Sequence, residues 1–431
     1  MQPQPPDSGL DIFNLRDEVI GDYRNYIESF LKIRDERVQS FVHGELEQGE
    51  LWPAPLIQMN PSYKEGENVA ALVQQGVLHP ACKNYFANFT FRYHQVQAFL
   101  AAQRREPYVL TTGTGSGKSM AYVVPIIDDI LRNPQIQGVR AILVYPMNAL
   151  INSQKEEFDK FLKTVPGSPI RVEQYTGQEG LTKKSEIQQN PPQILLTNYV
   201  MLELMLSRTH ENKLVESPNL NFLILDELHT YRGRQGADVA LLVRKLRQRC
   251  GQDFLCIGTS ATMSTEGSRE NRRQTVAGVA SKLFGVEVKP KNVIDETLKP
   301  SIQRPDPTDK ELMAAVVTPL PPEDEQTKEA FLKHPLAAWM EKAFGLKDEE
   351  GFLVRRVPIS LSQGAVQLAQ ITGGEEESCL EKLKQMFLWG SRTKGLAFRL
   401  HQFVSQGGSV YATIEPHENR FLTLEGQYIT T

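Results

Sequence analysis

A glycine-rich stretch, 112–119 (TGTGSGKS), has the residue types and spacing of a loop that binds phosphate. It follows a short apolar run and opens an amphipathic segment, which is the strand-to-helix context that such a loop requires. Glycines let successive N–H groups converge on phosphate oxygens, and the start of the following helix adds partial positive charge. We therefore expect nucleotide binding by Thr112, Gly113, Thr114, Gly115, Ser116, Gly117, Lys118 and Ser119.

Two residues of this stretch have separate chemical roles. Lys118 would neutralise charge on the β- and γ-phosphates, and the Ser119 hydroxyl would ligate Mg²⁺. The usual pattern begins with glycine, and this sequence departs from it with Thr112. A flexible Gly/Ser turn without a ligand is the alternative interpretation, which the Gly-Lys-Ser run at a strand-to-helix junction disfavours.

An acidic pair, Asp226 and Glu227, stands directly after the apolar run 222–225. Because the carboxyl ends of parallel strands line the ligand crevice of an open sheet, this run would bring both carboxylates to the phosphates. Asp226 would hold Mg²⁺ through water, and Glu227 would accept a proton from the attacking water. A helix N-cap with an acidic first turn explains the pair when it is taken alone. Together with the glycine-rich loop, the pair indicates a catalytic site made of Glu227, Asp226 and Lys118.

A third motif, 258–262 (GTSAT), follows another apolar run. The hydroxyl groups of Ser260 and Thr262 could couple the acidic pair to other parts of the crevice. Hydroxyl-rich loops after strands are common, so this motif is a weak signal by itself.

These motifs require strands that end at one edge of a sheet, and the sequence supplies them. Short apolar runs are separated by enough chain for a crossover helix, which is typical of a parallel sheet covered on both faces. The helix after the first run is expected over about 117–131, where Asn133-Pro134 stops it. The expected fold class is therefore α/β, and the runs are 108–111, 141–145, 171–175, 194–197, 222–226 and 254–260.

The segments on either side of this alternation have a different pattern. We expect a helical N-terminal accessory region over 1–88, the nucleotide-binding domain over 89–265, a linker over 266–330 and a mostly helical accessory region over 331–431. In the last region, helices are expected over 335–344, 363–371, 376–388 and 396–404, and a strand over 409–414. The two helices within 363–388 would pack as plain helices or, less commonly, form a small winged-helix-like module.

Composition excludes several classes of protein. The 431 residues carry 48 Lys and Arg against 52 Asp and Glu, so any basic surface that binds nucleic acid must be local. The four cysteines are scattered without a C-x-x-C pair, which argues against a zinc or disulfide framework. No run approaches the roughly 18 apolar residues of a membrane span, and the polar start has no signal-peptide core. We expect a cytoplasmic protein with no membrane partner.

With these motifs, the sequence resembles superfamily 2 nucleic-acid helicases of the DEAD/DEAH kind over about 92–262. The glycine-rich loop is similar to their motif I, 226–229 (DELH) to motif II, and 260–262 (SAT) to motif III. The sequence more closely resembles large prokaryotic DEAD/DEAH-box helicases, some of them in anti-phage defence, at 226–233 (DELHTYRG), 145–150 (YPMNAL) and 398–403 (FRLHQF). The resemblance implies a RecA-like P-loop NTPase domain that hydrolyses ATP with Mg²⁺.

The resemblance also implies roles for single residues. The stretch 93–98 (YHQVQA) is similar to the Q motif, which implies that Gln95 reads the adenine edge. His229 would bind near the nucleotide and couple its state to strand binding. Three further loops are similar to motifs that grip the backbone of one nucleic-acid strand, although strand-to-helix turns and helix caps would explain them too. Their implied contacts are Pro146, Asn148, Thr176, Gly177, Thr197 and Asn198.

Motors of this kind hold ATP between two RecA-like lobes, and the second lobe supplies arginines to the reaction. After Thr262 the sequence has no second alternation of buried strands and no Q-x-x-G-R-x-x-R-like stretch. We expect the ATP-binding lobe of an ATP-dependent helicase or translocase, from a truncated sequence or a split motor, whose full turnover needs a second lobe or partner protein. DNA, as a single strand or duplex junction, is preferred through the prokaryotic resemblance alone. An ATP-gated DNA- or partner-binding scaffold and an RNA helicase remain alternatives.

Overall fold

The computed structural model describes residues 11–49, 51–87, 89–113, 115–251, 253–260, 268–302, 304–405 and 409–424. The chain divides into two compact units. The sheet unit comprises residues 63–297, and the split unit comprises residues 1–62 together with 298–431. No helix in the described part of the chain is long and apolar enough to cross a membrane.

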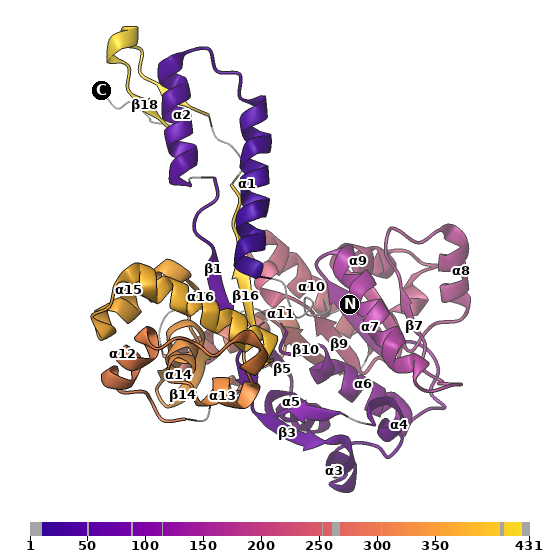
Figure 1. The fold of residues 1–431 in the computed structure, drawn as a ribbon. Coiled ribbons are helices and arrows are strands. Elements are labelled where there is room, and N and C mark those ends of the chain that lie inside the picture. The colour runs from indigo at the N-terminus through magenta and orange to yellow at the C-terminus, as the bar shows by residue number, and fades with distance from the viewer. Residues whose placement is uncertain are drawn as a thin grey trace. The chain divides into compact units, whose positions relative to one another are not determined.

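A seven-stranded parallel sheet forms the centre of the sheet unit, in the order β11-β5-β10-β9-β6-β8-β7 (Figure 1). The six apolar runs of the sequence are all strands of this sheet, which confirms the predicted α/β class. The strands are β5 (Tyr108–Thr111), β6 (Ala141–Tyr145), β7 (Val172–Gln174), β8 (Ile194–Asn198), β9 (Phe222–Leu225), β10 (Leu255–Thr259) and β11 (Val293–Asp295).

Helices cover both faces of this sheet. On β5, Tyr108 and Leu110 pack with α5 (Tyr93–Gln103), α6 (Met120–Arg132) and α7 (Asn148–Lys163). Val109 faces the opposite way and packs with α9 (Tyr199–Ser207), α10 (Gly233–Cys250) and α11 (Arg269–Phe284). Since successive strand side chains point to opposite faces, a sheet buried on both sides needs apolar residues at every position. That requirement explains why the runs are continuous rather than alternating.

Smaller elements complete the sheet unit. The strands β3 (Glu65–Asn68) and β4 (Thr90–Arg92) pair antiparallel, and β4 leads directly into α5. The other helices are α3 (Val69–Gln74), α4 (Cys82–Phe86) and α8 (Leu181–Gln189), with 3-10 turns at Asn212–Leu214, Leu228–Thr230 and Pro290–Asn292.

The expected linker over 266–330 differs from the structure. Its first half holds α11 and β11, and β11 pairs with β5 as the edge strand of the parallel sheet. A strand of three residues is too short to show a period in the sequence, and its pairing partner lies far away in the chain. The second half holds the short strand β12 (Leu298–Lys299), the helix α12 (Asp309–Val317) and a 3-10 turn at Glu323–Glu325.

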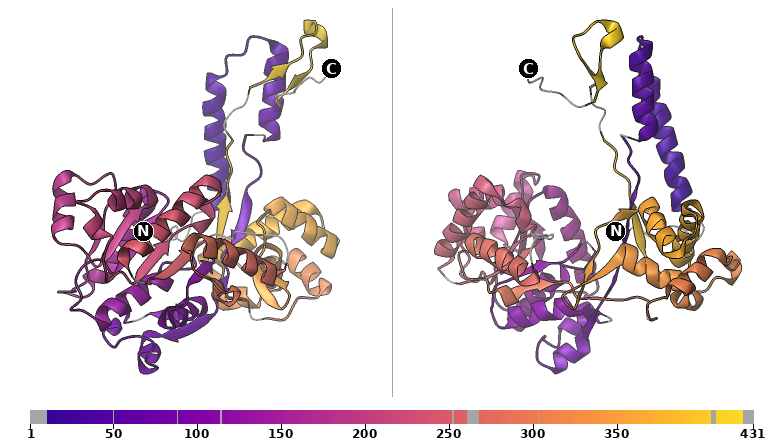
Figure 2. Two further views of the ribbon diagram at one scale, coloured as in Figure 1. Left: turned by 180° about the vertical axis from the view of Figure 1, so that it is seen from behind. Right: turned by 90° about the vertical axis from the view of Figure 1, so that its left-hand side faces the viewer.

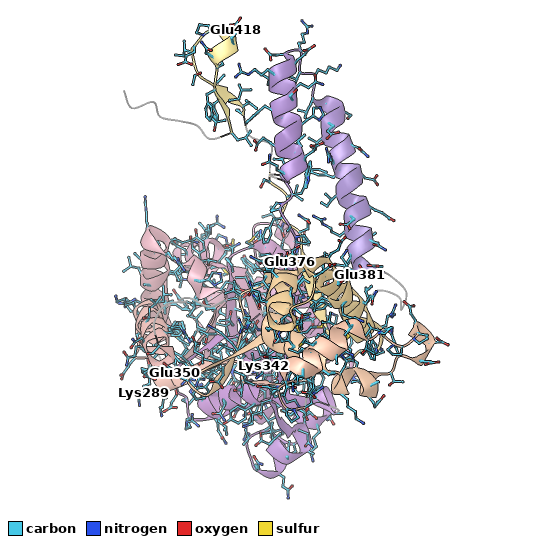
Figure 3. All side chains as sticks on the ribbon, turned by 60° about the vertical axis from the view of Figure 1, so that its left-hand side comes forward. Lys289, Lys342, Glu350, Glu376, Glu381 and Glu418 are labelled. Atoms are coloured by element: carbon cyan, nitrogen blue, oxygen red, sulfur yellow. The ribbon has the colours of Figure 1, made fainter. Side chains whose placement is uncertain are left out.

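The split unit joins the two ends of the chain around a small antiparallel sheet. Strand β1 (Leu56–Met59) lies between β15 (Ile359–Ser360) and β16 (Phe398–His401). Around it pack α13 (Lys328–Lys333), α14 (Pro335–Met340) with a π-helical turn at Glu341–Gly345, α15 (Leu361–Thr372) and α16 (Glu376–Arg392). Figure 3 labels Glu376 and Glu381 on the exposed side of α16, whereas Leu383 and Phe387 are buried.

The remaining elements of the split unit are a helix pair and short strands. The helices α1 (Ile12–Phe30) and α2 (Glu36–Gln48) run side by side (Figure 2), as the sequence predicts. Strands β13 (Leu346–Glu349) and β14 (Phe352–Arg355) form one antiparallel pair, and β17 (Tyr411–Ala412) and β18 (Leu422–Thr423) form another. The last elements are β2 (Ser62–Tyr63) and a 3-10 turn at His417–Asn419.

The helix expected over 396–404 is wrong, because residues 398–401 form strand β16. Leu400 and Phe398 on β16 are the register partners of Ile57 and Met59 on β1. The ring of Phe398 also lies 4.8 Å from that of Phe387 on α16. The strand is stabilised by a partner strand more than 300 residues away in the chain, and the local spacing of apolar residues cannot reveal such a partner. Strand β17 falls inside the expected strand at 409–414 and is shorter than expected.

Candidate nucleotide-binding site

The loops that carry the predicted motifs all leave the same edge of the parallel sheet, where its strands have their carboxyl ends. The glycine-rich loop follows β5, the acidic pair follows β9, and Ser260 follows β10, which lies between those two strands. The residues predicted to contact nucleic acid lie at or just after the carboxyl ends of β6, β8 and β7, on the other half of the edge. The strand order therefore separates this edge into two halves. The phosphate half (β11-β5-β10-β9) carries the motifs predicted to bind nucleotide, and the strand half (β6-β8-β7) carries the residues predicted to contact a nucleic-acid strand.

Three side chains from the start of α5 hold the glycine-rich loop. Arg92 Nη1 donates to the Gly115 carbonyl at 2.8 Å, His94 Nε2 to the Ser116 carbonyl at 3.1 Å, and Gln95 Nε2 to the Gly117 carbonyl at 2.9 Å. In a trans peptide, C=O and the next N–H point in opposite directions. Turning three consecutive carbonyls toward α5 therefore turns the following N–H groups away from α5, as a phosphate cradle requires.

Glycine at 117 is needed for two reasons. Its φ of +72° lies in the left-handed region, and a Cβ there would sit 2.7 Å from Gln95 Nε2. Thr112, where the usual pattern has glycine, is buried, and its Oγ1 lies 2.6 Å from Ser116 Oγ. This hydroxyl pair spans the loop, so threonine at 112 adds a contact rather than disturbing the turn. Thr114 lies outside the described residues.

The acidic pair is brought to the loop by a strained turn after β9. Glu227 adopts φ +53° and ψ +55°, a left-handed conformation that is costly for a non-glycine residue. In this position its Oε1 lies 3.8 Å from Lys118 Nζ, and its Oε2 lies 3.2 Å from His229 Nδ1. The conformation therefore places one carboxylate between the lysine of the first motif and the histidine of the second.

The end of β10 ties these motifs together. Thr259 Oγ1 donates to Asp226 Oδ1 and accepts the Glu227 N–H at 3.1 Å. Ser260 Oγ lies 3.4 Å from His229 Nδ1. The sequence predicts a bridging role for Ser260 and Thr262. The structure places Ser260 beside His229, adds Thr259 as a contact to both acidic residues, and does not describe Thr262.

The surroundings of Asp226 favour a bound cation. Burial, with a further contribution from the neighbouring Glu227, raises the pKa of Asp226 to about 6. Tyr122, which hydrogen-bonds to Ser119, is close enough to Asp226 for that carboxylate to contribute to its raised pKa. Ser119 and Asp226 therefore share one neighbourhood, and both offer the hard oxygen donors that Mg²⁺ prefers. The residues fit a magnesium ion, which would restore the charged form of the carboxylate.

Gln95 and His94 serve the loop in this structure. Besides donating to Gly117, Gln95 accepts the Arg92 N–H on Oε1 at 2.8 Å, so both ends of its amide have partners. Burial lowers the pKa of His94 to about 4, so the ring is neutral at pH 7 and donates through Nε2. The sequence assigns no role to Arg92 or His94, because their partners are backbone carbonyls, which no motif reveals.

Most of the predicted polar side chains on the strand half form hydrogen bonds to neighbouring groups within the sheet unit. Thr197 is buried, and its Oγ1 donates to the Tyr175 carbonyl at 2.7 Å. Thr176 is also buried and donates to Glu179 at 2.8 Å. Asn198 caps α9 by accepting the Met201 N–H at 2.8 Å, which is the alternative that the sequence left open for it. These contacts direct the polar side chains inward, toward the protein.

The more accessible predicted residues on this half are few. Asn198 Nδ2 donates to Asn148 Oδ1 at 2.9 Å, and both side chains are half-buried. Pro146 is half-buried, and Gly177 is exposed. The structure thus brings Asn148 and Asn198 together and leaves the backbone at Gly177 accessible.

The sequence is similar to that of known helicases. Residues 92–270 match the DEAD/DEAH box helicase family. An uncharacterized ATP-dependent helicase (MJ1574) of Methanocaldococcus jannaschii is 30% identical over 247 residues, which is 52% of this chain and 34% of that protein. Druantia protein DruE of Escherichia coli is 26% identical over 380 residues, 60% of this chain and 21% of that protein.

The solved structures include the DUF1998 helicase MrfA bound to DNA. Its sequence is 25% identical to this one, and the match covers 59% of this chain and 34% of the MrfA chain, with a TM-score of 0.46. The chain thus spans about a third or less of the length of these relatives. The described motifs lie in the same part of the chain as the match to the DEAD/DEAH box helicase family, residues 92–270.

Proposed function

We propose that this chain is the ATP-binding part of an ATP-dependent DNA helicase or translocase, which couples ATP hydrolysis to movement along a strand. The observation that carries the proposal is the approach of Lys118 Nζ to Glu227 Oε1, at 3.8 Å, on the phosphate half of the sheet edge. The loops of the strand half leave the same edge of the same sheet. A triphosphate and a nucleic-acid strand could therefore bind next to each other.

The residues of the site would have different roles in ATP binding and hydrolysis. Lys118 and the N–H groups of the glycine-rich loop would hold the β- and γ-phosphates. Ser119 and Asp226 would hold Mg²⁺, which neutralises charge on the phosphate oxygens when bound. Glu227 would accept the proton of the attacking water, and His229, between Glu227 and Ser260, would pass changes at the nucleotide to the neighbouring loops.

Full turnover would also need arginines from a second RecA-like lobe. In other phosphoryl-transfer proteins, a supplied arginine raises the rate by roughly 10³–10⁵. Among the described residues, the sheets of the split unit have only two or three strands, and the pairs β1–β15, β1–β16, β13–β14 and β17–β18 are antiparallel. We propose that the second lobe comes from another segment or another chain.

The experiment is a comparison of Glu227→Gln with wild-type protein. The variant should bind Mg-ATP with normal affinity, and in assays with the second lobe present it should lose ATP turnover and strand displacement by about 10³-fold, since it lacks the general base. Glu203→Gln, on the exposed surface of α9, is the matched control and should behave as wild type. Normal turnover by Glu227→Gln would refute the proposed mechanism.

One observation favours a second candidate function. The polar side chains of Thr176 and Thr197 are occupied within the protein, as an ATP-gated scaffold without unwinding activity would permit. A strand-displacement assay with the second lobe present separates the two functions, because a scaffold would bind DNA and displace no strand. Competition between DNA and RNA strands of the same sequence, in the same assay, tests the preference for DNA.

A further inference from the structure

A second acidic pair, Asp295 and Glu296, lies beside the glycine-rich loop at the end of β11. Asp295 is the register partner of Thr111 on β5, and it accepts a hydrogen bond from Thr111 Oγ1 at 2.7 Å. Glu296 Oε2 accepts the Gly113 N–H at 3.2 Å. Both residues lie beyond the stretch 92–270 that matches the helicase family. They contact the residue that precedes the loop and the second residue of the loop itself.

Two arginines of α11 hold Asp295 in place. Arg269 Nε and Nη2 each lie 3.0 Å from Asp295 Oδ2, and Arg273 Nε lies 2.8 Å from the same oxygen. The two guanidinium groups carry two positive charges, and the Asp295 carboxylate neutralises one of them. The remaining positive charge offsets the negative charge of Glu296. An acidic pair can therefore stand next to a phosphate site without adding net negative charge to it.

These contacts complete a frame around the loop. Arg92, His94 and Gln95 hold the carbonyls of residues 115–117 from the α5 side. Glu296 holds the N–H of residue 113 from the β11 side. A loop with glycine at 113, 115 and 117 has much conformational freedom, and each contact made before the nucleotide arrives lowers the entropy that binding must remove.

We propose that Glu296 and Asp295 are positioning residues of the nucleotide site, which fix the amino-terminal end of the phosphate loop before ATP binds. The inference rests on the proposed function and extends the site to α11 and β11. The frame around the loop then has one side on α5 and the other on β11.

The test uses the full chain and a fluorescent N-methylanthraniloyl ATP with Mg²⁺. Glu296→Ala removes the acceptor of the Gly113 N–H and should raise the Kd about tenfold, the effect of one hydrogen bond lost from the loop. Glu296→Gln keeps an acceptor oxygen and should stay within about twofold of wild type. In nucleotide-free protein, amide hydrogen exchange over residues 111–119 should be faster in Glu296→Ala and unchanged in Glu296→Gln.

Three results would overturn the inference. Wild-type or tighter nucleotide binding by Glu296→Ala would show that the carboxylate does not prepare the loop. An equal loss in Glu296→Gln would assign the effect to charge alone. If Glu296→Ala does not fold, Thr111→Val removes the hydrogen bond to Asp295 with little change of shape, and wild-type affinity in that variant would be the contradicting result.

The outcomes also separate this inference from the proposed function. If wild-type protein binds no Mg-ATP, the proposed function fails, and the inference fails with it. If wild-type protein binds Mg-ATP and Glu296→Ala binds it equally well, the inference alone is refuted.

Discussion

On the phosphate half of the sheet edge, charged side chains from different loops approach one another, whereas on the strand half the polar side chains bond to nearby backbone groups or to a neighbouring polar side chain. Lys118, Glu227 and His229 come from two separate loops and lie within 4 Å of a partner. Thr197 and Asn198 instead donate to Tyr175 and cap α9. The difference suggests that the phosphate half recognises its ligand through side-chain charge. The strand half would contact nucleic acid through backbone groups and the few accessible amides.

The largest expected effect breaks the phosphate half. Lys118→Ala should weaken Mg-ATP binding about a hundredfold, because the partly buried site for the charged phosphates loses the positive charge of the lysine. Isothermal titration of the full chain measures the affinity. Lys160→Ala, which removes an exposed lysine on α7, is the control and should bind as wild type. Equal affinities for the two variants would contradict the role of Lys118.

A second prediction uses the buried histidine of the phosphate half. The folded protein lowers the pKa of His94 to about 4 from an ordinary value of 6.5, so the unfolded chain takes up a proton first as the pH falls. The free energy of unfolding should therefore lose about 2 kcal/mol from this group between pH 7 and pH 5. Urea unfolding at both pH values measures the loss, which should shrink in His94→Gln and persist in His210→Gln, an exposed-histidine control.

The third prediction sharpens the role of the strand half. Asn148→Asp keeps an acceptor for Asn198 Nδ2 and adds a negative charge at this edge. Single-stranded DNA affinity should fall about tenfold at low salt, with a smaller loss at high salt, because the new charge repels phosphates. Mg-ATP binding should not change. Fluorescence anisotropy with a labelled oligonucleotide measures the effect, and Asn190→Asp, before the amino end of β8, should bind DNA normally.

The smallest expected effect is on stability. Asn198→Ala removes the cap of α9 and should lower the free energy of unfolding by about 1 kcal/mol. Asn198→Ser retains a capping oxygen and should recover most of this loss, and both variants should bind Mg-ATP as wild type. A change in ATP affinity in either variant would mean that the two halves are coupled more tightly than their contacts indicate.

The sequence predicts the sheet unit well because its information is local. A strand buried on both faces, such as Ala141–Tyr145, is a continuous apolar run that needs no knowledge of its neighbours. The phosphate loop is equally local, since Lys118 and its glycines are adjacent in the chain. The approach of Glu227 to Lys118 follows from strand order together with the motif pattern.

The missed features depend on partners far away in the chain. Strand β16 is completed by β1, more than 300 residues earlier, and Phe398 packs on Phe387 of α16. The edge strand β11 has three residues, and Glu296 reaches a backbone N–H of a loop more than 180 residues before it. Backbone partners leave no mark on residue type at their own position, so neither His94 nor Glu296 could be recognised from the sequence.

The most direct test of the account is the effect of Mg²⁺ on ATP affinity in wild-type protein and in Asp226→Asn. If the glycine-rich loop and the acidic pair bind one magnesium-nucleotide complex, Mg²⁺ should tighten ATP binding at least about tenfold in the wild type, and by less than about threefold in the variant. A variant that keeps the full magnesium effect would contradict the claim that Asp226 and Lys118 serve the same bound nucleotide.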